Sequence, residues 1–225
     1  MTVNSCPPLA FLHTARPNNA LFSDLIQRID PTVTVHHELV EAVMLEAAGT
    51  GTLTGGMRDR TETTIRSLAY AGARLIVCTC STIGAVAEST VLEAGKRVMR
   101  IDRPMAEAAV SSGRRVVVAT TLRSTVGPTM DLLQQVAAEM AKGVELTELA
   151  CESAWAHYER GDLDAYAAAI ADCVTRGVGS DDQVVLAQAS MAPAAALLAT
   201  RGISALSSPE LGVRAALEAY RRSSN

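Results

Sequence analysis

The chain has 225 residues, of which 48% are hydrophobic, and a formal net charge of −4. This length suits one large domain or two lobes of roughly 100 residues each. Two Phe, one Trp and the lack of a basic stripe argue against a nucleic-acid partner. No apolar run approaches the roughly 20 residues of a membrane span, and residues 1–10 do not resemble a signal peptide. Membrane and nucleic-acid functions are therefore poor first interpretations.

The five cysteines are an odd number in a chain large enough to fold without disulfides. Cys78 and Cys80 are too close together for an ordinary structural disulfide, and no set of His and Cys has zinc-finger spacing. We therefore predict free thiols in a reducing cytoplasm and no metal site.

Short apolar runs alternate with longer, alanine-rich segments of helical period. The predicted strands are residues 9–13, 32–36, 74–79, 97–101, 115–119, 144–149, 183–187 and 202–206. Strands that are each followed by a helix indicate an α/β protein with parallel sheets. A helix is predicted from about Thr82 to Gly95, and another from about Pro128 to Gly143. The last helix is predicted over Pro209–Arg221.

The second half of the chain repeats the first. "LAFLHT", ending at Thr14, matches "VVVATT", ending at Thr121, and "VCTCST" from Val77 matches "LAQASM" from Leu186. Together with two weaker matches, the offsets lie between 105 and 110 residues. We predict two similarly folded lobes that face each other, residues 1–103 with 209–225 and residues 104–208.

Cys80 is the leading candidate for a reactive group. Ligands of open parallel sheets bind beyond the carboxyl ends of the strands, and Cys80 and Ala189 each fall just past a predicted strand. A thiol at a helix N-terminus has its thiolate favoured by the helix dipole and the unpaired N–H groups. The alternative is a small packing residue, with Ser81 or Thr82 as the helix cap. Cys78, two residues deeper in the strand, is predicted to be core.

These features resemble the aspartate/glutamate/hydantoin racemase superfamily over nearly the whole chain. The resemblance rests on the repeat, on "CST" at 80–82, on "TTLRST" at 120–125 and on "LAQAS" at 186–190. It implies two pseudo-symmetric flavodoxin-like lobes, each a parallel sheet flanked by helices, with the active site between them. It also implies no cofactor, a small carboxylate substrate or its cyclic amide, and a homodimer.

Carried over by position, the resemblance makes Cys80 the catalytic thiol. It implies a substrate-binding role for Ser81, Thr82, Thr121, Ser124, Thr125 and Ser190. Thr14, which follows the first strand, is also predicted to touch the ligand. The usual members act with two cysteines on opposite faces of the substrate, whereas this chain has Ala189 at the second position.

Three explanations of that departure remain open. Another group, such as Cys151 or His13, supplies the second acid or base. Alternatively one thiol suffices, as in a decarboxylase or lyase, or in an isomerase that adds a thiolate to a double bond. The third is a carboxylate-binding protein without catalysis. The leading prediction is a cofactor-independent racemase or isomerase of a small carboxylate, acting by proton transfer or thiolate attack.

Overall fold

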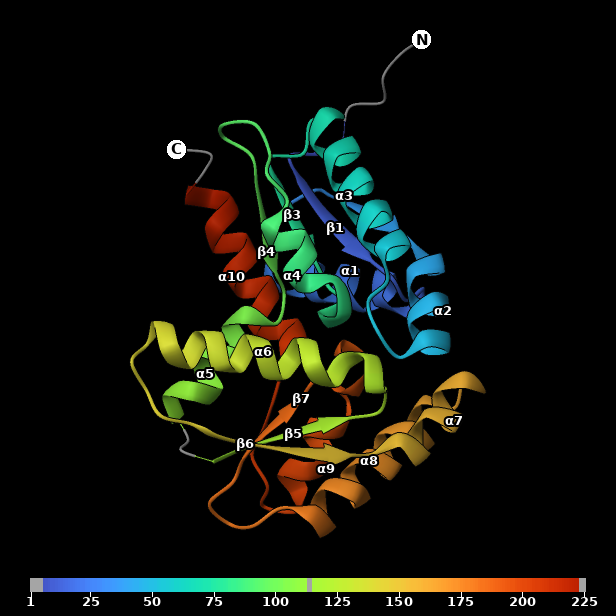
Figure 1. Cartoon of the computed structure of the whole chain (residues 1–225), viewed down its shortest axis with the longest axis vertical. Helices are drawn as coiled ribbons and strands as arrows, with labels where there is room; N and C mark the ends of the chain where they lie inside the picture. Colours follow the sequence, from blue (N-terminus) through green and yellow to red (C-terminus); the bar gives the residue numbers. More distant parts are fainter. Residues whose placement is uncertain (1–5, 113–114, 223–225) are drawn as a thin grey trace. The chain divides into compact units, whose positions relative to one another are not determined.

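The chain forms two four-stranded parallel sheets (Figure 1), and their central strands are buried runs rich in Val, Leu, Ile and Ala. The computed structural model describes residues 6–112 and 115–222. The chain divides into two units: unit 1 consists of Met1–Ile101 and Pro209–Asn225, and unit 2 of Asp102–Ser208. The prediction of an α/β fold with two parallel sheets flanked by helices is confirmed.

Unit 1 has the strand order β2-β1-β3-β4. Its strands are β1 (Leu9–His13), β2 (Val35–Leu39), β3 (Leu75–Cys78) and β4 (Arg97–Arg100). Its helices are α1 (Pro17–Ile29), α2 (Glu41–Thr50), α3 (Gly55–Tyr70), α4 (Ser81–Ser89) and α10 (Ser208–Arg222). The last helix returns to this unit, where the Arg97 side chain donates to the Ala219 carbonyl and Arg221 pairs with Asp30.

The core of unit 1 follows from the alternation of side chains along β1 and β3. Ala10, Leu12 and Ile76 point to the face that is covered by Met57 and Ile65 of α3 and by neighbouring apolar side chains. The other face of β1 contributes Phe11, which packs on Phe22 of α1 with ring centroids 5.8 Å apart. Both faces of the sheet are therefore buried, as expected of parallel strands.

Unit 2 repeats this topology with the strand order β6-β5-β7-β8. Its strands are β5 (Arg115–Thr120), β6 (Glu145–Ala150), β7 (Gln183–Leu186) and β8 (Ala205–Ser207). Its helices are α5 (Arg103–Ser112), α6 (Arg123–Glu139), η1 (Glu152–Ala154), α7 (Trp155–Glu159), α8 (Leu163–Gly177), η2 (Ala189–Met191) and α9 (Ala194–Thr200). Helices α8 and α9 cover the face of the sheet that presents Ala119, Val184 and Leu186.

Several predicted boundaries are wrong for identifiable reasons. β2 begins at Val35 rather than residue 32, because helix α1 and a turn at residues 31–32 occupy the chain up to that point. Helix α4 ends at Ser89, and Gly95, with φ at +82°, belongs to the following turn. Helix α6 begins at Arg123, so Pro128 lies inside it instead of near its start.

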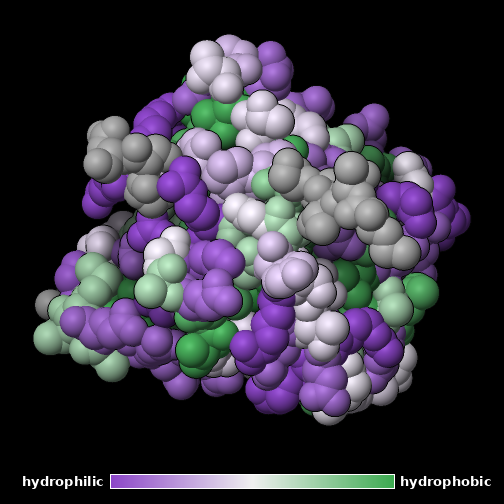
Figure 2. Space-filling view, turned by 90° about the horizontal axis from the view of Figure 1, so that it is seen from above, coloured by the Kyte–Doolittle hydropathy of each residue, from purple (hydrophilic) through white to green (hydrophobic). Residues whose placement is uncertain are grey.

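Apolar surface is scattered rather than gathered. Figure 2 shows small apolar areas among polar residues on the face that it displays. The exposed large apolar side chains of the described residues are Leu45, Tyr70, Val91, Met140, Leu163 and Leu197. Within residues 6–112 and 115–222, no helix combines the length and apolar character that crossing a bilayer requires.

Candidate active site

Each sheet has one point at which the strand order reverses. In unit 1 this point lies between β1 and β3, and in unit 2 between β5 and β7. Ligands of open parallel sheets bind outside the carboxyl ends of the strands at such a switch point. His13 and Cys80 lie at this point in unit 1, and Thr121 and Gln188 at the one in unit 2. The sequence-predicted candidates therefore lie where this topology positions ligands.

Cys80 is the N-cap residue of α4. Its backbone is extended (φ −114°, ψ 118°), and its side chain makes no capping hydrogen bond. The thiol is free and half-buried, and it packs beside the core of unit 1. Cys78 is buried, as predicted for a core residue. A free, partly accessible sulfur at the start of a helix has the placement that a thiolate base or nucleophile needs.

A buried arginine lies directly against α4. Arg100, at the end of β4, is 2% exposed. A Cβ on Gly84 would lie 2.5 Å from Arg100 Nε and 2.7 Å from its Cζ, so a larger residue there would have to displace the guanidinium. The guanidinium therefore packs directly on α4, the helix that carries Cys80 at its N-terminus.

A hydrogen-bonded chain runs through the histidines of unit 1. Thr79, which precedes Cys80, donates from its hydroxyl to the Leu12 carbonyl (3.1 Å), so it accepts from Nδ1–H of His13 (2.8 Å). Nε2 of His13 then accepts from Nδ1–H of His37 (2.8 Å), and Nε2 of His37 accepts from Ser23 Oγ–H (3.0 Å). Each hydroxyl and ring nitrogen is satisfied when both histidines are neutral.

His13 was a candidate for the second acid or base. It has no exposed surface, and both of its ring nitrogens are hydrogen-bonded. Burial, and then the neighbouring His37, lowers the pKa of His13 to about 3. A ring that is sealed, neutral and fully bonded holds the turn before Cys80 in place, and this argues against an acid–base role.

Acid should destabilise the protein through His13. An unfolded histidine with a pKa near 6.5 binds a proton that folded His13, with a pKa of about 3, does not bind. Its contribution is present above pH 6.5 and is lost as the pH falls toward 3. We expect about 2 kcal/mol less stability at pH 5 than at pH 8, measured by urea unfolding. Burial also lowers the pKa of His37, which acts in the same direction.

His13→Asn removes the titrating ring and keeps a donor for Thr79. It should flatten the slope of stability against pH between pH 5 and 8, whereas His157→Asn in α7 should keep it. The pKa of Asp30 is lowered to about 2, mainly by a hydrogen bond from Thr32, so Asp30 changes the stability only below pH 5. The change in stability between pH 5 and 8 therefore reports on histidines. An unchanged slope in His13→Asn would contradict the assigned role.

Unit 2 carries a second polar chain, the Tyr166 cluster, which consists of Thr121, Tyr166, Gln188 and Ser190. Gln188 Oε1 accepts from the Thr121 backbone N–H (2.7 Å) and from the Thr121 hydroxyl (2.9 Å). Thr121 Oγ1 lies 3.0 Å from the Tyr166 hydroxyl, which lies 3.1 Å from Ser190 Oγ. The structure thus brings together two predicted site residues with two that the sequence motifs did not single out.

Tyr166 is held rigidly. Its side chain is 1% exposed, and its ring packs against Tyr158 and Trp155 with centroids 5.2 Å and 6.5 Å away. Burial raises the pKa of Tyr166, and the hydrogen bonds with Ser190 and Thr121 oppose the shift. The phenol therefore stays protonated at neutral pH. The Tyr166 cluster can donate hydrogen bonds, but it contains no base.

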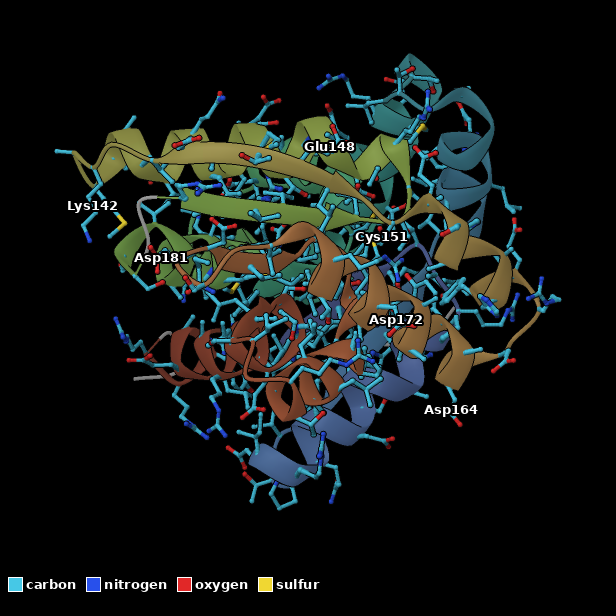
Figure 3. The ribbon with its side chains drawn as sticks, turned by 90° about the horizontal axis from the view of Figure 1, so that it is seen from below. Lys142, Glu148, Cys151, Asp164, Asp172 and Asp181 are labelled. Atoms are coloured by element: carbon cyan, nitrogen blue, oxygen red, sulfur yellow. A yellow bond between two sulfur atoms is a disulfide. The ribbon has the colours of Figure 1, made fainter. Side chains whose placement is uncertain are left out.

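Cys151 forms a disulfide with Cys173 of α8. This finding contradicts the prediction of free thiols for these two cysteines and the proposal of Cys151 as a second catalytic thiol. A disulfide sulfur has no proton to transfer. Cys151 is 1% exposed and follows directly on β6 (Figure 3), where its N–H donates to the Thr120 carbonyl at 2.7 Å. The bond therefore ties the end of β6 to the helix that carries Tyr166.

The remaining predicted residues lie close to the two switch points. Thr14 is buried just after β1, and Ser81 and Thr82 are buried in the first turn of α4. Ser124 and Thr125 are buried in the first turn of α6, where the Thr125 N–H donates to the Leu122 carbonyl. In the part of the chain that the structure describes, no group of three or more His, Cys, Asp and Glu is placed to bind a metal ion.

Comparison with known proteins defines the class of fold. No protein-family model and no curated protein matches the sequence. Solved structures, in contrast, match over nearly the whole chain, and they show that it has the fold of glutamate, aspartate and allantoin racemases. The resemblance indicated by the motifs is confirmed at the level of fold.

Three of these structures illustrate the likeness. Glutamate racemase from Thermus thermophilus is 17% identical, with a TM-score of 0.72, over 98% of this chain and 83% of that one. Aspartate racemase from Picrophilus torridus is 13% identical, with a TM-score of 0.73, over 94% and 93%. Allantoin racemase from Klebsiella pneumoniae is 16% identical, with a TM-score of 0.65, over 95% and 88%.

Proposed function

We propose that the protein is an isomerase that moves the proton on the carbon next to a carboxyl or carbonyl group of a small acid or cyclic amide, without a cofactor. Cys80 is the base that removes the proton. The observation that carries this proposal is the free thiol at the N-cap of α4, at the β1/β3 switch point of a racemase-type fold. The similar structures, described as glutamate, aspartate and allantoin racemases, support the reaction class.

A single thiol is proposed because unit 2 offers no second one. Ala189 stands where the resemblance expects the other cysteine, and Cys151 is bonded to Cys173. Tyr166 is buried and stays protonated at neutral pH, as do the hydroxyls around it, so none of them can take a proton from a substrate. The proposed reaction therefore begins on one face of the substrate only.

Solvent exchange tests the proposal. Incubation in heavy water with D- or L-aspartate, D- or L-glutamate and substituted hydantoins should place deuterium at the α carbon of at least one of them. The thiol formed at Cys80 exchanges its proton with heavy water and returns a deuteron to the same face. Exchange should therefore precede loss of optical rotation, which requires the solvent to protonate the other face. Proton NMR follows exchange and polarimetry follows inversion. Inversion without prior exchange would contradict a one-thiol mechanism, and no exchange in any compound would contradict the reaction class.

The same one-sided chemistry favours a second candidate, a decarboxylase. Loss of carbon dioxide leaves a carbanion that needs one proton on one face, and Cys80 could deliver it as a thiol. Disubstituted malonates in heavy water distinguish the two reactions. A decarboxylase should release carbon dioxide and incorporate one deuteron, whereas the isomerase should leave these acids unchanged because they have no α proton.

A further inference from the structure

The side-chain amide of Gln188 is fixed in one orientation. The Thr121 backbone N–H points at it from 2.7 Å and the Thr121 hydroxyl from 2.9 Å, so the atom that receives both must be the amide oxygen. The amide nitrogen, Nε2, lies on the other side of the group. Among the described residues none accepts a hydrogen bond from it, and the residue is half-buried. Gln188 thus offers two amide hydrogens from an anchored position.

The hydroxyls beside Gln188 can point in either of two directions. With Thr121 donating to Gln188, Tyr166 donates to Thr121 and Ser190 donates to Tyr166. If all three hydroxyls reverse, Thr121 donates to Tyr166, Tyr166 donates to Ser190, and Ser190 points its proton outward. Gln188 Oε1 keeps the Thr121 backbone N–H in both arrangements. A ligand oxygen can therefore receive the Ser190 proton without leaving a buried hydroxyl unpaired.

The geometry points to Gln188 as a substrate-binding residue whose Nε2 donates to an sp² oxygen of the ligand, with Ser190 Oγ as the second donor. Such an oxygen belongs to a carboxylate or to an amide carbonyl. Gln188 follows β7 at the β5/β7 switch point, where a ligand is expected. The Tyr166 cluster holds no charged side chain, so recognition relies on neutral donors. This inference rests on the proposed function, because it takes its ligand from the proposed class of substrate.

Tyr166 and Thr121 are positioning residues in this account. They do not face the ligand themselves; they hold the Gln188 amide and determine which way the Ser190 proton points. The side chain of Tyr166 is fixed by Trp155 and Tyr158, so the whole chain of hydrogen bonds is anchored on a rigid aromatic group. Binding should therefore weaken when either anchor loses its hydroxyl, even though the Gln188 side chain remains.

Gln188→Glu is the sharpest variant. Thr121 still donates to one carboxylate oxygen, so the anchor is kept, but the free end changes from a donor to an acceptor with negative charge. KM for whichever compound exchanges its α proton should rise roughly 10- to 100-fold, with a smaller change in kcat. Tyr166→Phe should raise KM about 3- to 10-fold. Gln134→Glu, the same change at an exposed position of α6, should have no effect on KM.

Binding can be followed without turnover. The side-chain amide signals of Gln188 in a ¹⁵N-labelled protein are assigned by their loss in Gln188→Glu. They should shift saturably with succinate if the site takes a carboxylate, or with succinimide if it takes an amide carbonyl. A shift with either compound that is weakened in Tyr166→Phe supports the inference. No shift with either, or an unchanged KM in Gln188→Glu, overturns it.

The two proposals fail separately. If wild-type protein exchanges α protons while Gln188→Glu keeps its KM, the reaction class stands and the role of Gln188 is wrong. If no compound exchanges while the Gln188 signals shift, the protein binds small acids or amides through Gln188, and the isomerase proposal is wrong.

Discussion

Cys80→Ser is expected to lower the rate of α-proton exchange by at least about 100-fold, the range that a positioned base contributes. A serine hydroxyl is far too weak an acid to ionise near neutral pH, so the base is lost. The fold should persist, because serine is a favourable N-cap residue of nearly the same size and Cys80 makes no capping hydrogen bond. The exchange assay in heavy water measures the loss, and circular dichroism checks the fold.

Cys6 provides a matched control, because it is the other free cysteine that is not fully buried. Burial and the neighbouring Glu38 raise the pKa of Cys6, which makes its thiolate scarce at neutral pH. Cys6→Ser should exchange α protons as fast as the wild type. Iodoacetamide should also label Cys80 faster than Cys6 near neutral pH, followed by peptide mass spectrometry. Full exchange activity in Cys80→Ser would remove the thiol from the mechanism.

The parts of the fold that could be predicted are those with strong local signals. β1, with five fully buried residues, was predicted with its observed bounds, because a short apolar run between turn residues has few alternatives. The strand predicted at residues 32–36 was placed too early in the chain relative to β2. The residues of β2 are half-buried and two of them are histidines, so no apolar run fixes the position of the strand. Helix α6 was predicted to start too late, because proline favours a first turn but is tolerated further along.

The candidate site shows the same division between local and long-range information. Cys80 and Thr121 could be proposed from the sequence because each follows a strand of a repeated pattern. Tyr166 was not found, because it lies 45 residues from Thr121 and reads as part of an alanine-rich helix. Only the packing of α8 on the sheet brings its hydroxyl to Thr121. The histidine chain of unit 1 likewise joins residues 24 and 66 positions apart, and no spacing rule predicts such contacts.

Reduction of the Cys151–Cys173 disulfide should lower the stability of unit 2 by about 3 kcal/mol. The two cysteines are 22 residues apart, and closing a loop of that length restricts the unfolded chain by about this amount. The bond spans η1, α7 and most of α8, the segment that carries Tyr166. Urea unfolding with and without dithiothreitol, followed by the fluorescence of Trp155 within that segment, measures the difference.

Cys173→Ser is the matched variant, because Cys173 is half-buried while Cys151 is sealed. It should show the stability of the reduced protein and should not respond to dithiothreitol. In denatured but unreduced wild type, iodoacetamide should label three of the five cysteines, and all five after reduction. Five labels before reduction would show that the bond does not form. In that case Cys151 would have a thiol, although its side chain is only 1% exposed. The exchange assay with Cys151→Ala would then decide whether Cys80 is the single catalytic thiol.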